Sequence, residues 1–309
     1  MNKFFLIYPL IFFVLHFLVK NWKPASNLLM DKDLDKIQGF HNTATVRSGG
    51  ILIFITWLFY LFLNKPVEIN LNFLIYFSIT NFLLGLFADT KLINSPIKRF
   101  FLAFFLNILI ILYYDFYINE FNFYIFDFLN SYFIFKVLLV FLAIFFITNG
   151  SNLIDGFNGL LSIHVLIILL ATLYVGMNSD FDIEIKNYIF FLIFLNILFL
   201  ILNFPNAKIF LGDCGAYFLG TQVACLLIYL SNNFEIISSF FIANILFYLF
   251  FEIFFSVFRK IVQRKNPFYP DRKHLHMLVY EFVKTKTKSA NPITSVIINL
   301  IFLMTIVPS

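Results

Sequence analysis

The sequence has little charge, and this scarcity excludes an ordinary water-soluble domain. Only 13% of its 309 residues are Asp, Glu, Lys or Arg, whereas 61% are hydrophobic and the mean hydropathy is +0.88. A chain of this length has too much apolar surface to bury in one soluble core, so the lipid bilayer is its expected solvent. We therefore expect an integral membrane protein.

Cysteine is also scarce. Cys214 and Cys225 are the only two, and their spacing is not that of a metal-binding or redox motif. The first apolar stretch has no small-residue cleavage site after it, which predicts a retained span and not a removed signal peptide. Because internal repeats, low-complexity tails and a second domain are absent from the pattern, we expect one integral membrane domain over residues 1–309.

Ten apolar stretches are long enough to cross a bilayer as helices, which takes about 20 residues each. They are residues 3–20, 48–64, 71–88, 99–118, 131–148, 157–176, 186–203, 214–231, 236–258 and 291–308. The predicted fold class is therefore all-α and polytopic. Between two of these stretches, residues 119–130 alternate apolar and polar side chains and lack Lys and Arg, which favours a small external hairpin or an interfacial segment.

Basic residues are nearly absent from one side of the predicted spans. If the N-terminus lies outside, eighteen Lys and Arg residues fall in cytoplasmic connections: five in 20–47, three in 91–99, Lys208 and nine in 259–288. Only Lys3, Lys65 and Lys186 fall outside. An excess of cytoplasmic Lys and Arg orients membrane helices, so the sequence predicts an external N-terminus.

Five polar stretches interrupt the apolar pattern, and this orientation places all of them at the cytoplasmic face. They are HNTATVRSGG (41–50), GLFADTKLINSPIKR (85–99), NGSNLIDGFNGL (149–160), NFPNAKIFLGDCGAYFLG (203–220) and NPFYPDRKHLHM (266–277). The pattern predicts one functional surface at the inner leaflet.

In NGSNLIDGFNGL, the residues Asn152, Asp155 and Asn158 are three apart. On a helix they would share one face, where a single ligand could meet them. Asn and Asp also cap helices and form turns, so a plain helix–loop–helix junction is an equally good interpretation.

Asp213 lies between two glycines at the start of an expected helix. The backbone can approach an anion there, and the carboxylate can hold a hard cation. Mg²⁺ needs only one or two carboxylates when substrate phosphate oxygens complete its shell.

PDRKHLH begins with a plausible helix N-cap at Asp271. His274 and His276 are two apart, so on a regular helix they would face different directions and could reach one ligand only if this piece were irregular. The alternative interpretation is a basic patch attracted to anionic lipid.

Two histidines and one glutamate within the expected spans need separate consideration. His16 and His164 are solitary, and we expect them to bond a backbone group or a neighbouring helix. Glu252 lies about two turns inside the cytoplasmic end of its span, and an acid at that depth is a candidate functional residue.

Taken in order, the five stretches resemble the polyprenyl-phosphate N-acetylhexosamine-1-phosphate transferase superfamily, glycosyltransferase family 4. NLIDGFNGL is similar to the family's NxxDGxDGL, IFLGDCGAYFLG to its FxGDxGSxxLG, and PDRKHLHM to its PDRxHxHH. HNTATVRSGG is similar to HxxxTPRxGG, and GLFADTKLINSPIKR to GxxDD followed by SPxxR. Each motif alone is weak, but five in order on one predicted face are specific.

The resemblance implies that undecaprenyl phosphate attacks the β-phosphorus of a UDP-sugar at the inner leaflet and releases UMP, with Mg²⁺, or else Mn²⁺, as the cofactor. It implies a multi-pass protein of the bacterial cytoplasmic membrane that initiates a cell-envelope glycan, with roles in cell wall or lipopolysaccharide synthesis. Membrane lipid is a further partner, a homodimer is an allowed assembly, and nucleic acid is not expected as a partner.

Residue roles carry over by position. Asp213 matches the metal-binding aspartate, and Phe210 matches the aromatic residue that stacks against uracil. The expected catalytic residues are Asp89, Asp155, His274 and His276. The expected substrate-binding residues are Arg47, Asn152, Asn158, Lys208, Phe210 and Arg272.

The chain also departs from the family pattern. The departures are Ala88 and Asn158 in place of acidic residues, Met277 in place of a second adjacent His, Val46 in place of Pro, and Glu252 in place of Asp. A transferase-like protein with weakened catalysis is therefore one alternative function. A secondary transporter or flippase is another, although transporters usually bind substrate near the bilayer midplane and not at the ends of spans. The sugar stays open among GlcNAc, GalNAc and modified di-amino sugars.

Overall fold

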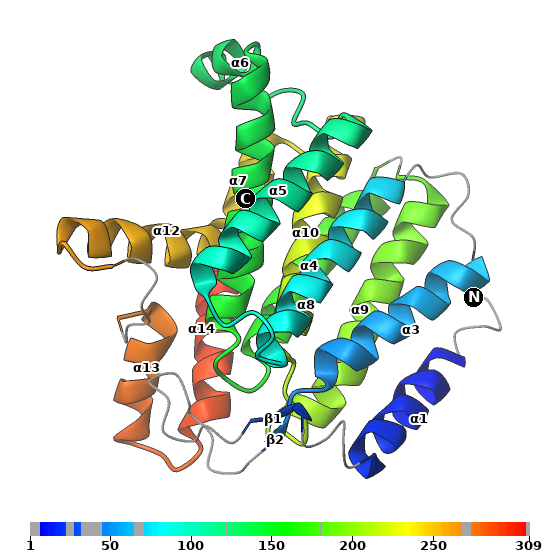
Figure 1. Cartoon of the computed structure of the whole chain (residues 1–309), viewed down its shortest axis with the longest axis vertical. Coiled ribbons are helices and arrows are strands. Elements are labelled where there is room, and N and C mark those ends of the chain that lie inside the picture. Colours follow the sequence, from blue (N-terminus) through cyan, green and yellow to red (C-terminus); the bar gives the residue numbers. More distant parts are fainter. Residues whose placement is uncertain are drawn as a thin grey trace.

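The computed structural model describes residues 7–22, 28–31, 45–64, 71–121, 123–179, 181–266 and 273–306. Apart from one short antiparallel pair, β1 (Met30–Asp31) and β2 (Thr45–Val46), the regular elements in these ranges are helices, as expected for an all-α protein (Figure 1). The helices are α1 (Ile7–Asn21), α3 (Gly49–Asn64), α4 (Asn72–Asp89), α5 (Pro96–Tyr114), α6 (Tyr124–Asn130), α7 (Phe133–Ile154), α8 (Leu160–Met177), α9 (Ile183–Asn203), α10 (Gly212–Asn233), α11 (Ser239–Ile245), α12 (Phe247–Val262), α13 (Leu275–Lys284) and α14 (Ala290–Ile306).

Six of the described helices are long and apolar enough to cross a membrane: α4, α5, α7, α8, α9 and α10. The bent pair of α11 and α12 would make a seventh span. The helices α1, α3 and α14 are apolar but shorter, with 15, 16 and 17 residues. The protein is therefore a multi-pass membrane protein, whereas the count of ten spans and the external N-terminus stay predictions.

The predicted span over residues 236–258 is not one continuous helix. The chain bends by 68° between α11 and α12. Just after the bend, the backbone carbonyl of Leu249 occupies the position where Gly150 of α7 would carry a Cβ atom. This close approach between α7 and α12 is a tertiary contact, which the apolar composition of the segment does not reveal.

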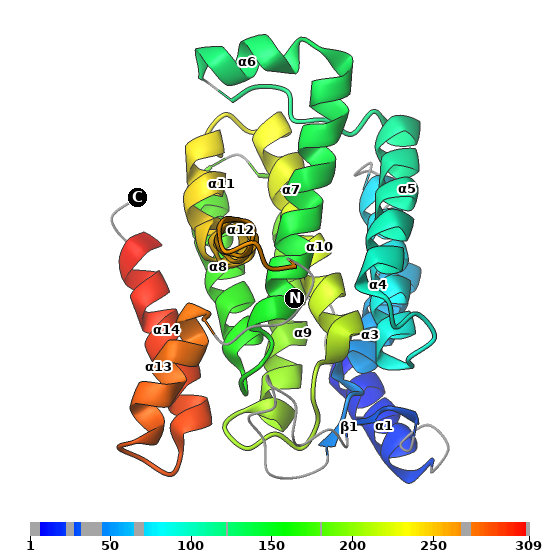
Figure 2. The same cartoon turned by 60° about the vertical axis from the view of Figure 1, so that its left-hand side comes forward.

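The described part of the segment 119–130 contains a short helix and no β-hairpin. Asp127 of α6 accepts hydrogen bonds from the backbone N–H groups of Phe121 at 2.7 Å and Phe123 at 2.9 Å, which fixes the turn into α6. Figures 1 and 2 show α6 at the end of the molecule opposite to β1 and β2. The hairpin expectation is therefore wrong, and the interfacial placement stays a prediction.

Helix α10 is the centre of the bundle, because 89% of the residues in its most apolar stretch are buried. It packs against α3, α4, α7 and α8. Small residues allow this close packing, as in many membrane helix pairs: the backbone of Asp213 and Cys214 lies where a Cβ on Gly85 of α4 would be. The N-terminus of α10 is thus held directly against the end of α4.

A buried chain of hydrogen bonds also joins four helices at the core. Trp57 donates to the hydroxyl of Tyr188 at 2.8 Å, and this hydroxyl donates to Gln222 at 2.6 Å. Gln222 in turn donates to Ser78 at 2.7 Å. Each of these four side chains has a hydrogen-bond partner, so the series connects α3, α9, α10 and α4 without an unsatisfied buried group.

Candidate active site

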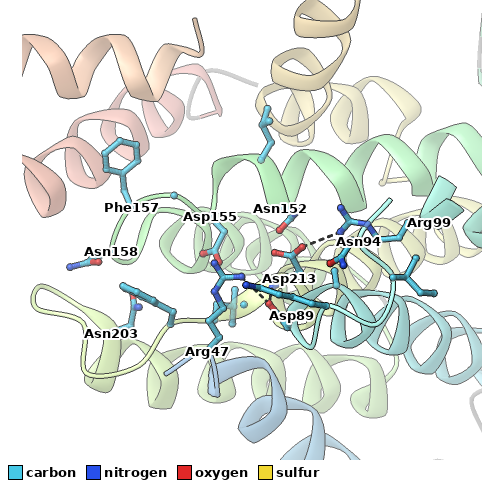
Figure 3. A pocket seen from close by; sticks show the side chains of 18 of the residues that line it. Arg47, Asp89, Asn94, Arg99, Asn152, Asp155, Phe157, Asn158, Asn203 and Asp213 are labelled. Atoms are coloured by element: carbon cyan, nitrogen blue, oxygen red, sulfur yellow. Dashed lines mark hydrogen bonds and ion pairs between the residues drawn. The ribbon is translucent and has the colours of Figure 1, made fainter. Parts of the chain in front are cut away.

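A pocket of about 410 Å³ opens where the C-terminal ends of α4, α7 and α9 meet the N-terminus of α10 (Figure 3). It is lined by Arg47, Ala88, Asp89, Lys91, Ile93, Asn94, Arg99, Asn152, Leu153, Asp155, Gly156, Phe157, Asn158, Asn203, Phe210, Leu211, Gly212, Asp213 and Met277. The lining comes from segments up to 230 positions apart in the sequence, from Arg47 to Met277. All five polar stretches noted in the sequence contribute to the lining, and the last of them, residues 266–277, contributes only Met277.

The segment around β2 brings Arg47 to the pocket. The N–H of Phe210 donates to the carbonyl of Val46 at 2.9 Å, and the N–H of Gly49 donates to the carbonyl of Phe210 at 2.9 Å. The loop before α10 is therefore hydrogen-bonded to the segment that carries Arg47. This pairing explains how two motifs about 160 residues apart line one wall.

The stretch NGSNLIDGFNGL forms a turn between two helices, so of the two interpretations the helix–loop–helix junction is confirmed and the continuous helical face is not. Helix α7 ends at Ile154, and Gly159, with φ of +73°, adopts the left-handed conformation that precedes α8. Nevertheless, Asn152, Asp155 and Asn158 all line the pocket. The junction thus brings the three side chains together without the helix that the spacing suggested.

Hydrogen bonds fix this turn against the loop between α9 and α10. The side chain of Asn203 accepts from the N–H of Gly159 at 2.6 Å and donates to the carbonyl of Ile209 at 2.9 Å. The amide of Asn158 donates to the carbonyl of Pro205 at 2.8 Å. Asn158 therefore bridges two walls of the pocket as well as facing it.

The carboxylate of Asp89, fully buried at its side chain, binds the N-terminus of α10. Its Oδ1 accepts from the N–H of Asp213 at 3.1 Å, and its Oδ2 accepts from the N–H of Cys214 at 2.9 Å. Gly212, with φ of +78°, has no side chain to block this approach, because a Cβ there would lie 2.7 Å from Asp89 Oδ2. Asp89 therefore fixes the backbone that carries Asp213.

Two arginines pair with two of the aspartates. Arg47 Nη1 lies 3.4 Å from Asp89 Oδ1, and Arg99 Nη1 lies 3.2 Å from Asp213 Oδ2. The Nε of Arg99 is buried and has no hydrogen-bond partner in the part of the chain that the structure describes. A buried guanidinium nitrogen of this kind fits an acceptor oxygen supplied by a ligand.

Asp155 lies just beyond the end of α7, partly buried in the same pocket. Burial, and then the carboxylates of Asp213 and Asp89, raise the pKa of Asp155 well above its usual range, while Arg47 acts in the opposite direction. Crowding of carboxylates destabilises their charged forms, and a bound cation would relieve it. The pocket is thus electrostatically suited to a cation together with an anion.

Seven of the eleven predicted site residues line this pocket: Arg47, Asp89, Asn152, Asp155, Asn158, Phe210 and Asp213. Among the described residues, Lys208, His274 and His276 are not in its lining, and Arg272 and Asp271 lie outside the described ranges. Helix α13 begins after His274, which is its N-cap residue. The two histidines face Glu252 of α12 and not the pocket, so Glu252 has a partner in each of them.

His164 behaves as expected for a solitary histidine in a span. Its Nδ1 lies 3.2 Å from Asn299 Oδ1 of α14, and its ring is 3.8 Å from the ring of Phe302 between centroids. It therefore connects α8 to a neighbouring helix. The prediction that His164 bonds a neighbouring helix is confirmed.

Sequence reasoning missed four polar residues of the pocket: Lys91, Asn94, Arg99 and Asn203. Arg99 closes the stretch GLFADTKLINSPIKR, from which only the acidic residue Asp89 was predicted to belong to the site. Ser95 caps α5 by accepting from the N–H of Lys98 at 3.4 Å, and this places Arg99 in the first turn. The motif itself was therefore the signal that could have found Arg99.

Comparison with known proteins identifies the family of this chain. The sequence profile described as Glycosyl transferase family 4 matches residues 71–231, more than half of the chain. The chain belongs to glycosyl transferase family 4. The matched range of this family 4 protein runs from α4 to α10 and includes most of the pocket, whereas Arg47 and Met277 lie outside it.

Three curated relatives carry related names. An undecaprenyl-phosphate alpha-N-acetylglucosaminyl 1-phosphate transferase of Thermotoga maritima is 35% identical over 139 residues, covering 44% of this chain and 41% of that protein. A phospho-N-acetylmuramoyl-pentapeptide-transferase of Dictyoglomus turgidum is 28% identical over 289 residues, covering 89% of each. A probable undecaprenyl-phosphate N-acetylglucosaminyl 1-phosphate transferase of Bacillus subtilis is 34% identical over 137 residues, covering 44% of this chain and 38% of that protein. The first and third matches thus span less than half of those relatives.

Proposed function

We propose that this protein transfers a sugar 1-phosphate, as a HexNAc 1-phosphate, from a UDP-sugar to undecaprenyl phosphate and releases UMP. The observation that carries the proposal is the convergence of Asp89, Asp155, Asp213, Arg47 and Arg99 in one pocket of a family 4 chain. The names of the relatives in Thermotoga and Bacillus supply the lipid acceptor and the transferred group. Phosphoryl transfer depends mainly on positioning and charge neutralisation, and this arrangement of charges suits both.

The donor would bind along the polar walls. The ring of Phe210 offers a face for uracil, and Asn152 offers an amide for hydrogen bonding in the same pocket. Arg99 and Lys91 would hold the diphosphate, since the buried Nε of Arg99 needs an acceptor and Lys91 lines the same cavity. These residues bind and orient the donor.

The donor set of the pocket fits Mg²⁺, with Mn²⁺ as the alternative. Asp155 and Asp213 provide carboxylate oxygens, which hard cations prefer. Among the described residues, no group of three or more His, Cys, Asp or Glu could hold a metal, but Mg²⁺ needs only one or two carboxylates besides water and phosphate oxygens. When bound, the ion would neutralise charge on the transferring phosphate.

Asp89 would act by holding Asp213 in place. Both of its carboxylate oxygens already accept backbone N–H groups, so removal of a proton from the acceptor is not its task. The lipid phosphate is a monoester with a second pKa of about 6, so much of it is already dianionic at neutral pH and needs no general base. Ala88, the neighbour that replaces an acidic residue, is then compatible with turnover.

The site would face the cytoplasm of a bacterial cell. The pocket lies at one end of α4, α7 and α10, and α6 lies at the opposite end of the molecule (Figures 1 and 2). Cysteine labelling with an impermeant maleimide should mark a cysteine at Glu120 in intact cells and leave one at Lys286 unlabelled. The reverse pattern would overturn this orientation, because UDP-sugars are cytosolic.

The activity test uses membranes that contain the protein, undecaprenyl phosphate, Mg²⁺ and a panel of UDP-sugars that includes UDP-GlcNAc, UDP-GalNAc and a UDP-di-amino sugar. We expect UMP release and a lipid-linked diphosphate sugar with one of them, and neither product with Asp213→Ala. If no donor yields UMP while the protein is inserted and folded, the transferase proposal is wrong. A protein of weakened catalysis, suggested by Ala88 and Met277, would then be the better account.

A further inference from the structure

A buried carboxylate of α12 is engaged by the loop and first turn of α13. Glu252 is 4% exposed, and its Oε2 lies 2.9 Å from the Nδ1 of His274. Its Oε1 accepts from the N–H of Leu275 at 2.9 Å and lies 3.9 Å from the Nδ1 of His276. The side chain of Glu252 therefore contacts three successive residues at the N-terminus of α13, from His274 to His276.

The two histidines are held as a pair against α12. Their rings are nearly parallel, with an interplanar angle of 6° and centroids 5.5 Å apart, and both are almost fully buried. His276 Nδ1 also lies 3.2 Å from the hydroxyl of Tyr248, which is one turn before Glu252 on α12. We name Tyr248, Glu252, His274 and His276 the α12–α13 clamp.

Helix α13 also reaches the pocket. Met277 is 2% exposed and lines the cavity, and it follows His276 directly in the chain. Phe157, another lining residue, contacts the ring of His276 at a centroid distance of 5.8 Å and that of Tyr280 at 5.2 Å. Displacement of α13 would therefore move two apolar residues of the pocket wall.

The clamp is separate from the charged centre of the pocket. Its four residues are not among the pocket lining, whereas Asp89, Asp155 and Asp213 are. Those aspartates stand on α4, at the end of α7 and on α10, which are held together by contacts that do not involve α13. Loosening the clamp should thus disturb the wall and leave the charged centre in place.

We propose that Glu252 is a positioning residue for the donor site: it holds His274 and His276 against α12, and so holds Met277 and Phe157 at the wall where the sugar nucleotide binds. The link between this positioning role and the sugar nucleotide rests on the proposed transferase function. In this arrangement His274 and His276 act through hydrogen bonds and packing, and neither contacts the reacting phosphate. The expected signature is weaker donor binding at a nearly unchanged turnover number.

The first experiment separates a hydrogen-bonding histidine from a reactive one. In His274→Asn the amide nitrogen is bonded to Cγ, like Nδ1 of histidine, and can still donate to Glu252. In His274→Gln the nitrogen lies one atom further out and loses this position. We expect the KM for the UDP-sugar to stay within about threefold of wild type in His274→Asn and to rise about tenfold in His274→Gln, the size of one lost charge-assisted hydrogen bond.

Glu252→Gln supplies the second variant, and Ser256→Ala is its matched control. A glutamine keeps one acceptor oxygen, but its amide group faces one of the donors of the clamp, so KM should rise about tenfold with kcat within about threefold. Ser256 is one turn further along the same buried face of α12, and its hydroxyl has no hydrogen-bond partner in the described chain. Ser256→Ala should therefore leave both constants unchanged.

A distance measurement tests the clamp without relying on activity. Spin labels on cysteines introduced at Phe258 of α12 and Leu278 of α13, both exposed, report the separation of the two helices; the native Cys214 and Cys225 are buried. We expect a narrow distance distribution in the wild-type and Ser256→Ala backgrounds and a broader one in Glu252→Gln. If the wild type releases no UMP, the proposed function fails while this measurement still decides the clamp.

Three outcomes would overturn the proposal. One is an unchanged distance distribution and KM in Glu252→Gln. Another is a broadened distribution with an unchanged KM, since α13 would then not govern the donor wall. The third is an equal loss of kcat in His274→Asn and His274→Gln, which would make the imidazole itself part of the chemistry.

Discussion

Replacement of Asp89 by Asn tests whether this carboxylate positions Asp213 or removes a proton. The wild-type side chain accepts from the N–H groups of Asp213 and Cys214 through different oxygens and also pairs with Arg47. An asparagine has one acceptor oxygen, so its amide group must face one of these donors. Asp89→Asn therefore leaves one buried backbone N–H without an acceptor at the start of α10.

The size of the effect follows from these contacts. A buried donor without a partner costs about 1–3 kcal/mol. The ion pair with Arg47 is partly exposed on the arginine side, at 24%, and adds about 0–1 kcal/mol. A total of about 2 kcal/mol, if it is expressed fully in the placement of Asp213, lowers kcat/KM about 30-fold.

The assay is UMP release at several Mg²⁺ concentrations and several pH values. If Asp89 positions Asp213, the variant should need more Mg²⁺ for half-maximal rate and should keep the shape of the wild-type pH profile. Asp182→Asn, the same change at an exposed residue before α9, is the control and should have no effect. A loss above about a thousandfold with an altered acidic limb and an unchanged Mg²⁺ requirement would refute the positioning role, because that pattern belongs to a general base.

Three further predictions follow from the pocket and the clamp. Asp213→Ala, and also Asp213→Asn, should abolish UMP release while membrane insertion is retained, because a neutral group binds the cation more weakly; wild-type turnover at limiting Mg²⁺ would contradict this. Ala88→Asp should leave the rate unchanged or lower it, because it adds a carboxylate to a pocket that already holds three, and a large gain at acidic pH would show that a base was missing. Burial lowers the pKa of His276 to about 4, with Glu252 opposing this shift, so its stabilising contribution is present above pH 6.5 and is lost as the pH falls from about 6.5 to 4. The thermal unfolding temperature of the wild type in detergent should drop over that range by more than that of His276→Asn, and parallel curves would contradict the assignment.

The apolar stretches in the sequence located the helices well. Each of the ten predicted spans corresponds to a helix or, for residues 236–258, to the pair α11 and α12. The bend within that pair was missed because no Pro or Gly marks it locally, and the close approach of Leu249 to Gly150 of α7 beside it is a tertiary contact. The turn after Ile154 was one of two interpretations that the sequence left open, since Asn and Asp spaced three apart suit both a helical face and a helix junction.

What the sequence determined by itself is the membrane environment, the helical class and the stretches that form the pocket. Hydropathy and short motifs are local properties, because they depend only on residues that are close together in the sequence. Only the tertiary structure decided which way each polar side chain points: it joins Asp89 to the N-terminus of α10, pairs Arg99 with Asp213, and turns His274 and His276 toward Glu252 and away from the pocket. These pairings link residues 22 to 124 positions apart, and a charged group in a buried setting takes whichever partner the packing of the helices brings within hydrogen-bonding distance.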